Sequence, residues 1–94
     1  MNKIDRLEVP VSVKPHKGRI IIEKEILAPG LGLGYAYWVF FLDHGAFAGK
    51  RGHTSYVVKD DRDIPRHRND PYEIETCNSR YTVVTEEWWK EHGK

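Results

Sequence analysis

Histidine, cysteine and aspartate are the residue types in this chain that could bind a metal ion. They are His16, His44, His53, His67, His92 and Cys77, together with the aspartates of the run 60–63. Zinc sites in small domains use short ligand spacings such as Cys-x-x-Cys or His-x-x-x-His, and neither occurs here. The aspartate run also lacks the glycine and the closing glutamate of a calcium-binding loop. We therefore expect neither a metal site nor a cofactor.

The same residue types could form a catalytic site, but their spacing gives little support for one. The triplet His53-Thr54-Ser55 matches one half of a duplicated His-x-Ser/Thr motif of phosphoesterases, and the chain has no second copy. A Gly-x-Ser-x-Gly nucleophile elbow is also missing. Cys77 could act as a nucleophile with a distant histidine, although a lone cysteine beside a turn is more often a small half-buried residue. No residue is therefore predicted to be catalytic, and we expect the protein not to be an enzyme.

The glycine-rich segment 28–34 has the composition of a phosphate-binding loop. Its glycines alternate, at Gly30, Gly32 and Gly34. The spacing lacks the two-residue gap of the dinucleotide fingerprint and the Lys-Ser/Thr ending of a P-loop. A strand, and not a helix, is predicted to follow, so no helix N-terminus would face the phosphate. We interpret the segment as a flexible connector with a bulge that leads into the next strand.

Two polar loops, 45–52 and 60–71, carry the residue types that commonly anchor protein interfaces. The candidate partner-binding residues are Phe47, Lys50, Arg51, Arg62, Arg66, His67 and Arg68. In the second loop acidic residues come first and basic residues follow, which makes a local dipole that suits a protein surface with matching charges. We therefore predict a small binding protein, an adaptor or an inhibitor, that acts on a protein partner through these loops.

Nucleic acid is the alternative partner, because small β-barrels of the SH3-like or OB type bind strands with aromatic platforms and a basic rim. Two observations weigh against it. The aromatic residues cluster where the core must form, and loop 60–71 carries four aspartates against three arginines. A loop with that balance does not attract phosphate.

The composition is that of a soluble globular domain and not that of a disordered or membrane-spanning chain. Apolar residues make up 39% of the 94 residues and charged residues 31%, which favours one folded domain spanning 1–94. Fifteen lysines and arginines face fourteen acidic residues, so the net charge of +1 exerts no global pull on nucleic acid or anionic membranes. With one cysteine no intrachain disulfide can form, and the first residues lack a signal-peptide core. We expect a cytoplasmic protein without a membrane interaction, and homo-oligomerisation is left open.

The elements that must position these loops are predominantly strands. The run Tyr35–Leu42 is apolar on both alternating faces, so it is predicted to be a central strand covered on both sides, with Trp38 in the core. Period-two alternation and β-branched residues predict further strands over residues 7–13, 19–27, 53–59, 72–77 and 80–84. Thr85 is typical of a helix N-cap, followed by Glu86 and Glu87 in the first turn.

Proline, glycine and asparagine mark the turns between these strands. A turn is predicted at 15–18, and a hairpin across Asn78 and Ser79, because asparagine tolerates the left-handed backbone that a tight turn needs. The predicted fold class is mainly β: a small antiparallel β-barrel or sandwich of five to six strands with one short C-terminal helix.

Overall fold

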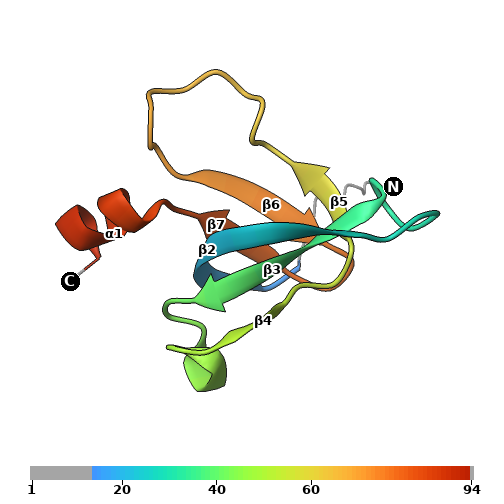
Figure 1. The fold of residues 1–94 in the computed structure, drawn as a ribbon, viewed down its shortest axis with the longest axis horizontal. Coiled ribbons are helices and arrows are strands. Elements are labelled where there is room, and N and C mark those ends of the chain that lie inside the picture. The colour runs from blue at the N-terminus through green and yellow to red at the C-terminus, as the bar shows by residue number, and fades with distance from the viewer. Residues whose placement is uncertain (1–13, 94) are drawn as a thin grey trace, which may run out of the picture.

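The computed structural model describes residues 14–93, which form one sheet and a short C-terminal helix (Figure 1). The strands are β2 (His16–Leu27), β3 (Tyr35–Phe41), β4 (Arg51–His53), β5 (Val57–Asp60), β6 (Tyr72–Thr76) and β7 (Arg80–Val83). A single 3-10 turn, η1 (Gly45–Phe47), follows β3, and the helix is α1 (Glu86–His92). The predicted mainly β class with one short C-terminal helix is confirmed. The helix in residues 14–93 is too short to cross a membrane.

The six strands form one sheet in the order β4-β3-β2-β7-β6-β5. The β2–β7 pair is parallel, so the prediction of an antiparallel sheet is wrong for this pair. The other four pairs are antiparallel, as predicted. β4 and β5 lie at opposite edges of this sheet, yet only the segment 54–56 joins them. The sheet must therefore curl until its two edges approach each other, and the Leu33 N–H donates to the Val57 carbonyl at 2.8 Å. The strand pairs do not close the ring, so a barrel or sandwich stays a prediction.

The core lies on the concave face of the curled sheet. Its buried members are Ile20, Tyr37, Val39, Phe41, Val57, Ile74, Tyr81 and Val83. They come from β2, β3, β5, β6 and β7, so each of these strands contributes one alternating set of side chains.

β3 is buried on one face and only partly buried on the other, where Ala36 is 8% exposed, so the prediction that both of its faces are covered holds only in part. Tyr37, Val39 and Phe41 are buried, whereas Trp38 and Phe40 on the opposite face are half-buried. The curl of the sheet explains the difference, because it gives the concave face a shared core and leaves the convex face nearer to solvent. Predicting Trp38 in the core was therefore wrong.

Two element boundaries differ from the predicted ones for local reasons. The predicted strand 53–59 is interrupted at 54–56, where the chain passes from β4, which pairs with β3, to β5, which pairs with β6 at the opposite edge of the sheet. The predicted turn 15–18 lies largely within β2, whose pairing with β7 contains an irregularity between His16 and Arg19. Gly18 adopts φ +105 at this irregularity, so the strand continues through it. The strand predicted over residues 7–13 lies outside the described residues.

The C-terminal hairpin and helix follow the sequence signals, with one change at the turn. β6 and β7 pair across residues 77–79, as predicted, but Asn78 does not have a positive φ. The Thr76 hydroxyl holds the turn by accepting from the Ser79 N–H at 3.2 Å. Thr85 is the N-cap of α1, because its hydroxyl accepts from the Trp88 N–H at 3.0 Å.

Candidate functional site

Loop 45–52 presents an aromatic side chain and two basic ones at the surface. Phe47 is 50% exposed, and its other side packs on Phe41 and His44, with ring centroids 5.6 and 4.9 Å away. Arg51 forms an ion pair with Glu23 at 3.1 Å, and its guanidinium lies over the Phe40 ring. Lys50 is exposed beside it. Phe47 and Lys50 are thus the side chains of this loop that remain available to a partner.

Arg66 shapes loop 60–71 from within. Its guanidinium donates to the carbonyl oxygens of Arg62 at 2.6 Å, Ile64 at 3.3 Å and Asp70 at 3.1 Å. The same group lies 4.3 Å from the centre of the Tyr72 ring. These contacts use most of the donors of the guanidinium, so Arg66 orders the loop more than it faces a partner.

Arg62 belongs to a polar network that fastens the start of this loop to the sheet. The Tyr35 and Tyr37 hydroxyls donate to the same oxygen of Asp60, at 2.7 and 2.6 Å. Only 3% of the Asp60 side chain is exposed, and Arg62 contacts it, Tyr37 and Glu25. Burial, and then the bond to Asp60, raise the pKa of Tyr35 to about 12 and push the pKa of Tyr37 upward as well.

His67 and Arg68 are the candidate residues of loop 60–71 that point outward. Both are exposed, and within residues 14–93 neither side chain makes a hydrogen bond or an ion pair. The structure thus divides the predicted site. Phe47, Lys50, His67 and Arg68 face solvent, while Arg51, Arg62 and Arg66 have partners inside the domain.

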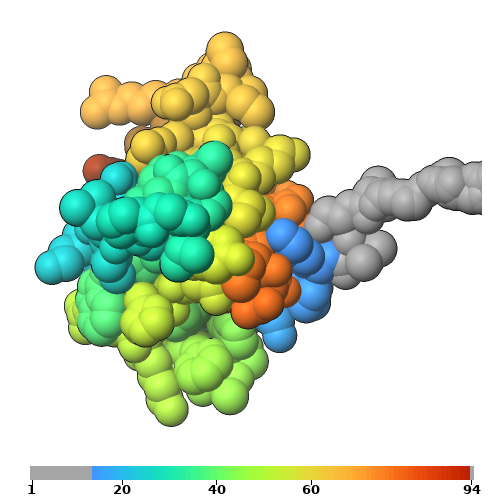
Figure 2. Space-filling model, turned by 90° about the vertical axis from the view of Figure 1, so that its right-hand side faces the viewer, coloured from blue at the N-terminus to red at the C-terminus, as the bar shows by residue number. Residues whose placement is uncertain are grey.

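Sequence reasoning missed the leucines of the turn between β2 and β3. Leu27, Leu31 and Leu33 are 79%, 49% and 52% exposed, and we call these three residues the leucine tip. Figure 2 shows this turn, coloured teal to green, at the front of the molecule with loop 60–71 above it. The signal in the sequence is a set of leucines spaced among glycines and Pro29, because such a turn is too short to reach the core.

The turn that carries the leucine tip is held by backbone hydrogen bonds. The Ala28 N–H donates to Gly34, and the Gly34 N–H donates to Leu31, at 2.9 and 2.7 Å. Gly32 has φ +50, and a Cβ there would overlap the Val57 carbonyl oxygen. Glycine is thus required for this close approach. The turn is hydrogen-bonded in the structure, and the interpretation of segment 28–34 as a flexible connector stays a prediction.

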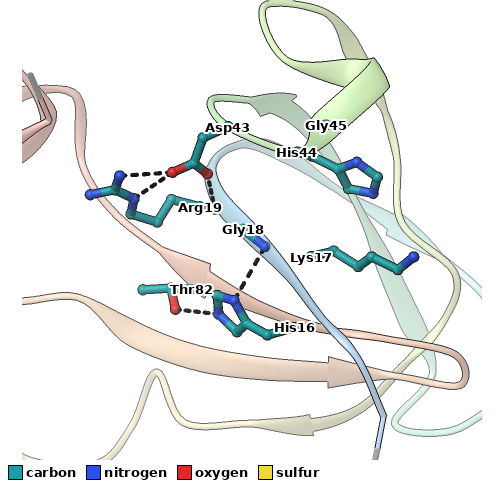
Figure 3. A pocket seen from close by; sticks show the side chains of 8 residues that line it. All are labelled: His16, Lys17, Gly18, Arg19, Asp43, His44, Gly45 and Thr82. Atoms are coloured by element: carbon teal, nitrogen blue, oxygen red, sulfur yellow. Dashed lines mark hydrogen bonds and ion pairs between the residues drawn. The ribbon is translucent and has the colours of Figure 1, made fainter.

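A polar cavity of about 520 Å³ opens where β2 meets the residues after β3 (Figure 3). Arg19 spans its wall and binds Asp43 at 2.7 Å. Burial alone would raise the pKa of Asp43, but hydrogen bonds from the Arg19 backbone and side chain hold that pKa below its usual value. Lys17 and His44 line the rest of the cavity.

His16 and His44 both line this cavity, and His16 lies beside a hydroxyl that a base could activate. The His16 Nδ1 accepts from the Gly18 N–H at 3.3 Å, so the ring proton is on Nε2, which lies 2.8 Å from the Thr82 hydroxyl. The imidazole therefore donates to Thr82 and cannot activate it as a nucleophile. Within residues 14–93 no three His, Cys, Asp or Glu side chains converge on a position that could hold a metal ion.

No protein-family model matches this chain, and neither a curated protein nor a solved structure is significantly similar to it.

Proposed function

We propose that this chain is a protein-binding domain, an adaptor or an inhibitor, whose main anchor is the leucine tip. The observation that carries the proposal is the exposure of Leu27 at the end of β2 and of Leu31 and Leu33 in the hydrogen-bonded turn that follows it. Burying a leucine side chain is worth about 1.5–3 kcal/mol, so three leucines on one protrusion supply a large part of the energy of a stable contact. An apolar cleft on a partner protein fits this shape.

The order of the turn supports the proposal energetically. Binding costs the entropy of every segment that has to be fixed, and a turn already held by hydrogen bonds loses little. The bond from the Leu33 N–H to the Val57 carbonyl also ties the turn to the start of β5. The leucine tip therefore needs no rearrangement of its backbone when it binds a partner.

The two polar loops provide the rim of the proposed interface. Phe47, Lys50, His67 and Arg68 are exposed and can add aromatic and charged contacts. Arg62 and Arg66 support the rim by holding loop 60–71 in shape. Charged rim residues set orientation and association rate more than affinity. The lone cysteine suits a cytoplasmic setting.

Affinity capture from a lysate of the native host tests the proposal. The wild type is compared with the double variant Leu31→Ser and Leu33→Ser, before and after nuclease treatment. The matched control is Ile64→Ser, because Ile64 is exposed to a similar degree, 55%, but lies in loop 60–71. The double variant should lose a nuclease-resistant partner that the control retains. Equal capture by all three proteins would refute the role of the leucine tip.

Single-stranded nucleic acid is the second candidate partner, because the convex face of the sheet carries aromatic and basic groups. Trp38 stacks on His53 with ring centroids 6.4 Å apart, and Arg51 lies over Phe40. Such groups stack on bases in small barrels of the SH3-like or OB type, the finer fold that this candidate implies. Labelled oligonucleotides titrated at low and physiological salt test it. Tight binding that weakens steeply with salt, and that Trp38→Ala removes, would put this candidate first.

A further inference from the structure

One edge of β2 lacks a paired strand over half of its length. The parallel pairing with β7 ends at Ile20 and Val83, whereas β2 continues to Leu27. On the side of β2 that faces β7, the hydrogen bond from the Val84 N–H to the Ile20 carbonyl, at 2.9 Å, is the last one between backbone groups of residues 14–93. Beyond Ile20, β2 pairs only with β3 in the part of the chain that the structure describes. Unpaired strand edges are templates for the addition of another strand.

The hydrogen-bond pattern identifies the backbone groups at this edge. The Ala28 N–H donates to the Gly34 carbonyl, so residues 28 and 34 are a hydrogen-bonded pair. Because every second residue of an antiparallel strand bonds to the neighbouring strand, Ile26 and Lys24 direct their backbone groups to β3 as well. Glu25 and Leu27 therefore turn their N–H and C=O groups toward the free side. Ile22 also turns its N–H and C=O groups toward the free side, because it lies two residues after Ile20, whose carbonyl accepts from Val84 on that side.

A cavity of about 400 Å³ lies against the same edge. Its apolar lining includes Ile21, Ile22, Val83 and Val84. The opposite wall is formed by the end of loop 60–71, where Arg66 covers Tyr72. Asp70 and Glu86 add two negative charges to the lining against the one positive charge of Arg66. The cavity thus offers apolar contact and an acidic rim beside free backbone groups.

We propose that the free edge of β2 binds an extended basic segment of a partner protein, which adds as a strand along Ile22–Leu27. Its backbone pairs with Ile22, Glu25 and Leu27, an apolar side chain enters the cavity, and a basic side chain meets Asp70 and Glu86. The inference rests on the proposed protein-binding function and gives the conformation and charge of the bound segment. Leu27 belongs to both the edge and the leucine tip, so the two surfaces are continuous.

The local structure of the edge restricts it to a short partner strand. A bulge between Ile22 and Lys24 interrupts the regular register. Glu23, Lys24 and Glu25 are all exposed there. Bulges and charges at an edge prevent open-ended pairing between copies, while one short peptide can still pair with Ile22, Glu25 and Leu27 across this single bulge.

Amide hydrogen exchange of the full chain tests the proposal, with an eight-residue peptide of alternating valine and lysine as the probe. The peptide should slow exchange of the Glu25 and Leu27 amides by about tenfold, a change of about 1.4 kcal/mol. The Lys24 and Ile26 amides are the internal control, because they already bond to β3 and should change little. The valine–glutamate counterpart should bind more weakly, since the rim is acidic. Unchanged exchange at Glu25 and Leu27 at saturating valine–lysine peptide would refute the proposal.

A pair of substitutions separates the backbone contact from the side chain. Glu25→Pro removes the N–H that faces the free edge, a position where a strand tolerates proline, and should weaken peptide binding by about tenfold. Glu25→Ala loses the same carboxylate but keeps that N–H, so it should bind the peptide about tenfold more tightly than Glu25→Pro does. Equal binding by both variants would overturn the proposal, and if Glu25→Pro does not fold the exchange experiment decides. The Leu31→Ser and Leu33→Ser variant should still bind this peptide, so failure of the leucine tip is distinguishable from failure of the edge.

Discussion

The Tyr37 hydroxyl donates a hydrogen bond of 2.6 Å to Asp60, which joins the middle of β3 to the end of β5. These strands are not neighbours in the sheet, so the contact crosses its concave side. Tyr35 donates to the same carboxylate oxygen at 2.7 Å. Two phenols and one buried carboxylate thus help to hold the curl of the sheet.

This network predicts a loss of stability in alkali. A tyrosine ionises near pH 10.0 when unfolded, whereas the pKa of Tyr35 is raised to about 12 and that of Tyr37 is raised too. Their contribution to stability is therefore complete below pH 10.0 and declines as the pH rises above it, with the Tyr35 part lost as the pH rises through about 12. Urea midpoints measured from neutral pH to about 12 should fall steeply for the wild type. The double variant Tyr35→Phe and Tyr37→Phe should show a shallower fall, and identical slopes would contradict the prediction.

Substitutions on the two faces of β3 should differ in cost. Phe41 is 6% exposed in the core, and Phe41→Ala should lower the free energy of unfolding by about 3–5 kcal/mol. Trp38 is half-buried on the convex face, so Trp38→Ala should cost less although it removes a larger side chain. Urea denaturation of both variants checks the order. A larger loss for Trp38→Ala would show that the convex face is covered.

Two glycines of the β2–β3 turn form a matched pair. Gly30 and Gly32 both have positive φ, so alanine at either position costs about 1–2 kcal/mol of backbone strain. A Cβ at Gly30 meets open space, whereas one at Gly32 overlaps Val57 and approaches Tyr56 to 2.8 Å. Gly32→Ala should thus be the more destabilising and should speed exchange of the Leu33 amide. Equal losses of stability in the two variants would mean that the contact between Gly32 and Val57 does not stabilise the turn.

Arg66 and Arg68 should behave differently although both are exposed arginines of one loop. Arg66→Ala removes three hydrogen bonds to loop carbonyls and the contact with Tyr72, so the loop should be cleaved faster by a protease. Arg68→Ala serves as the control and should leave the cleavage rate unchanged. If the two variants are cleaved equally fast, Arg66 does not order the loop.

The sequence predicts the elements whose signal is local. The strand at Tyr35, the final hairpin and the cap at Thr85 follow from alternation and from one side-chain hydrogen bond. The face of β3 that is buried could not be predicted, because both alternating sets are apolar and the curl of the whole sheet decides between them. The break at 54–56 is likewise set by the partners of β4 and β5, which are distant in sequence.

The candidate residues show the same limit. The charge and the exposure of loop 60–71 were predictable from its composition. The hydrogen bonds of Arg66 to carbonyls of the same loop were not, because they depend on the backbone conformation and not on the types of the neighbouring residues. The leucine tip was readable in principle, since apolar residues in a short glycine-rich turn cannot all be buried. The free edge of β2 was not, because it follows from where β7 ends relative to β2.

The parallel pairing of β2 with β7 also governs how fast the domain folds. Each hairpin, β2–β3 and β6–β7, forms from residues close in sequence. By contrast, His16 of β2 and Thr82 of β7, whose side chains hydrogen-bond to each other, are 66 positions apart. Closing so large a loop costs entropy before any contact compensates for it. The high contact order of this pair makes its closure the slow step, so destabilising either hairpin turn should change the folding rate less than weakening the contact between β2 and β7.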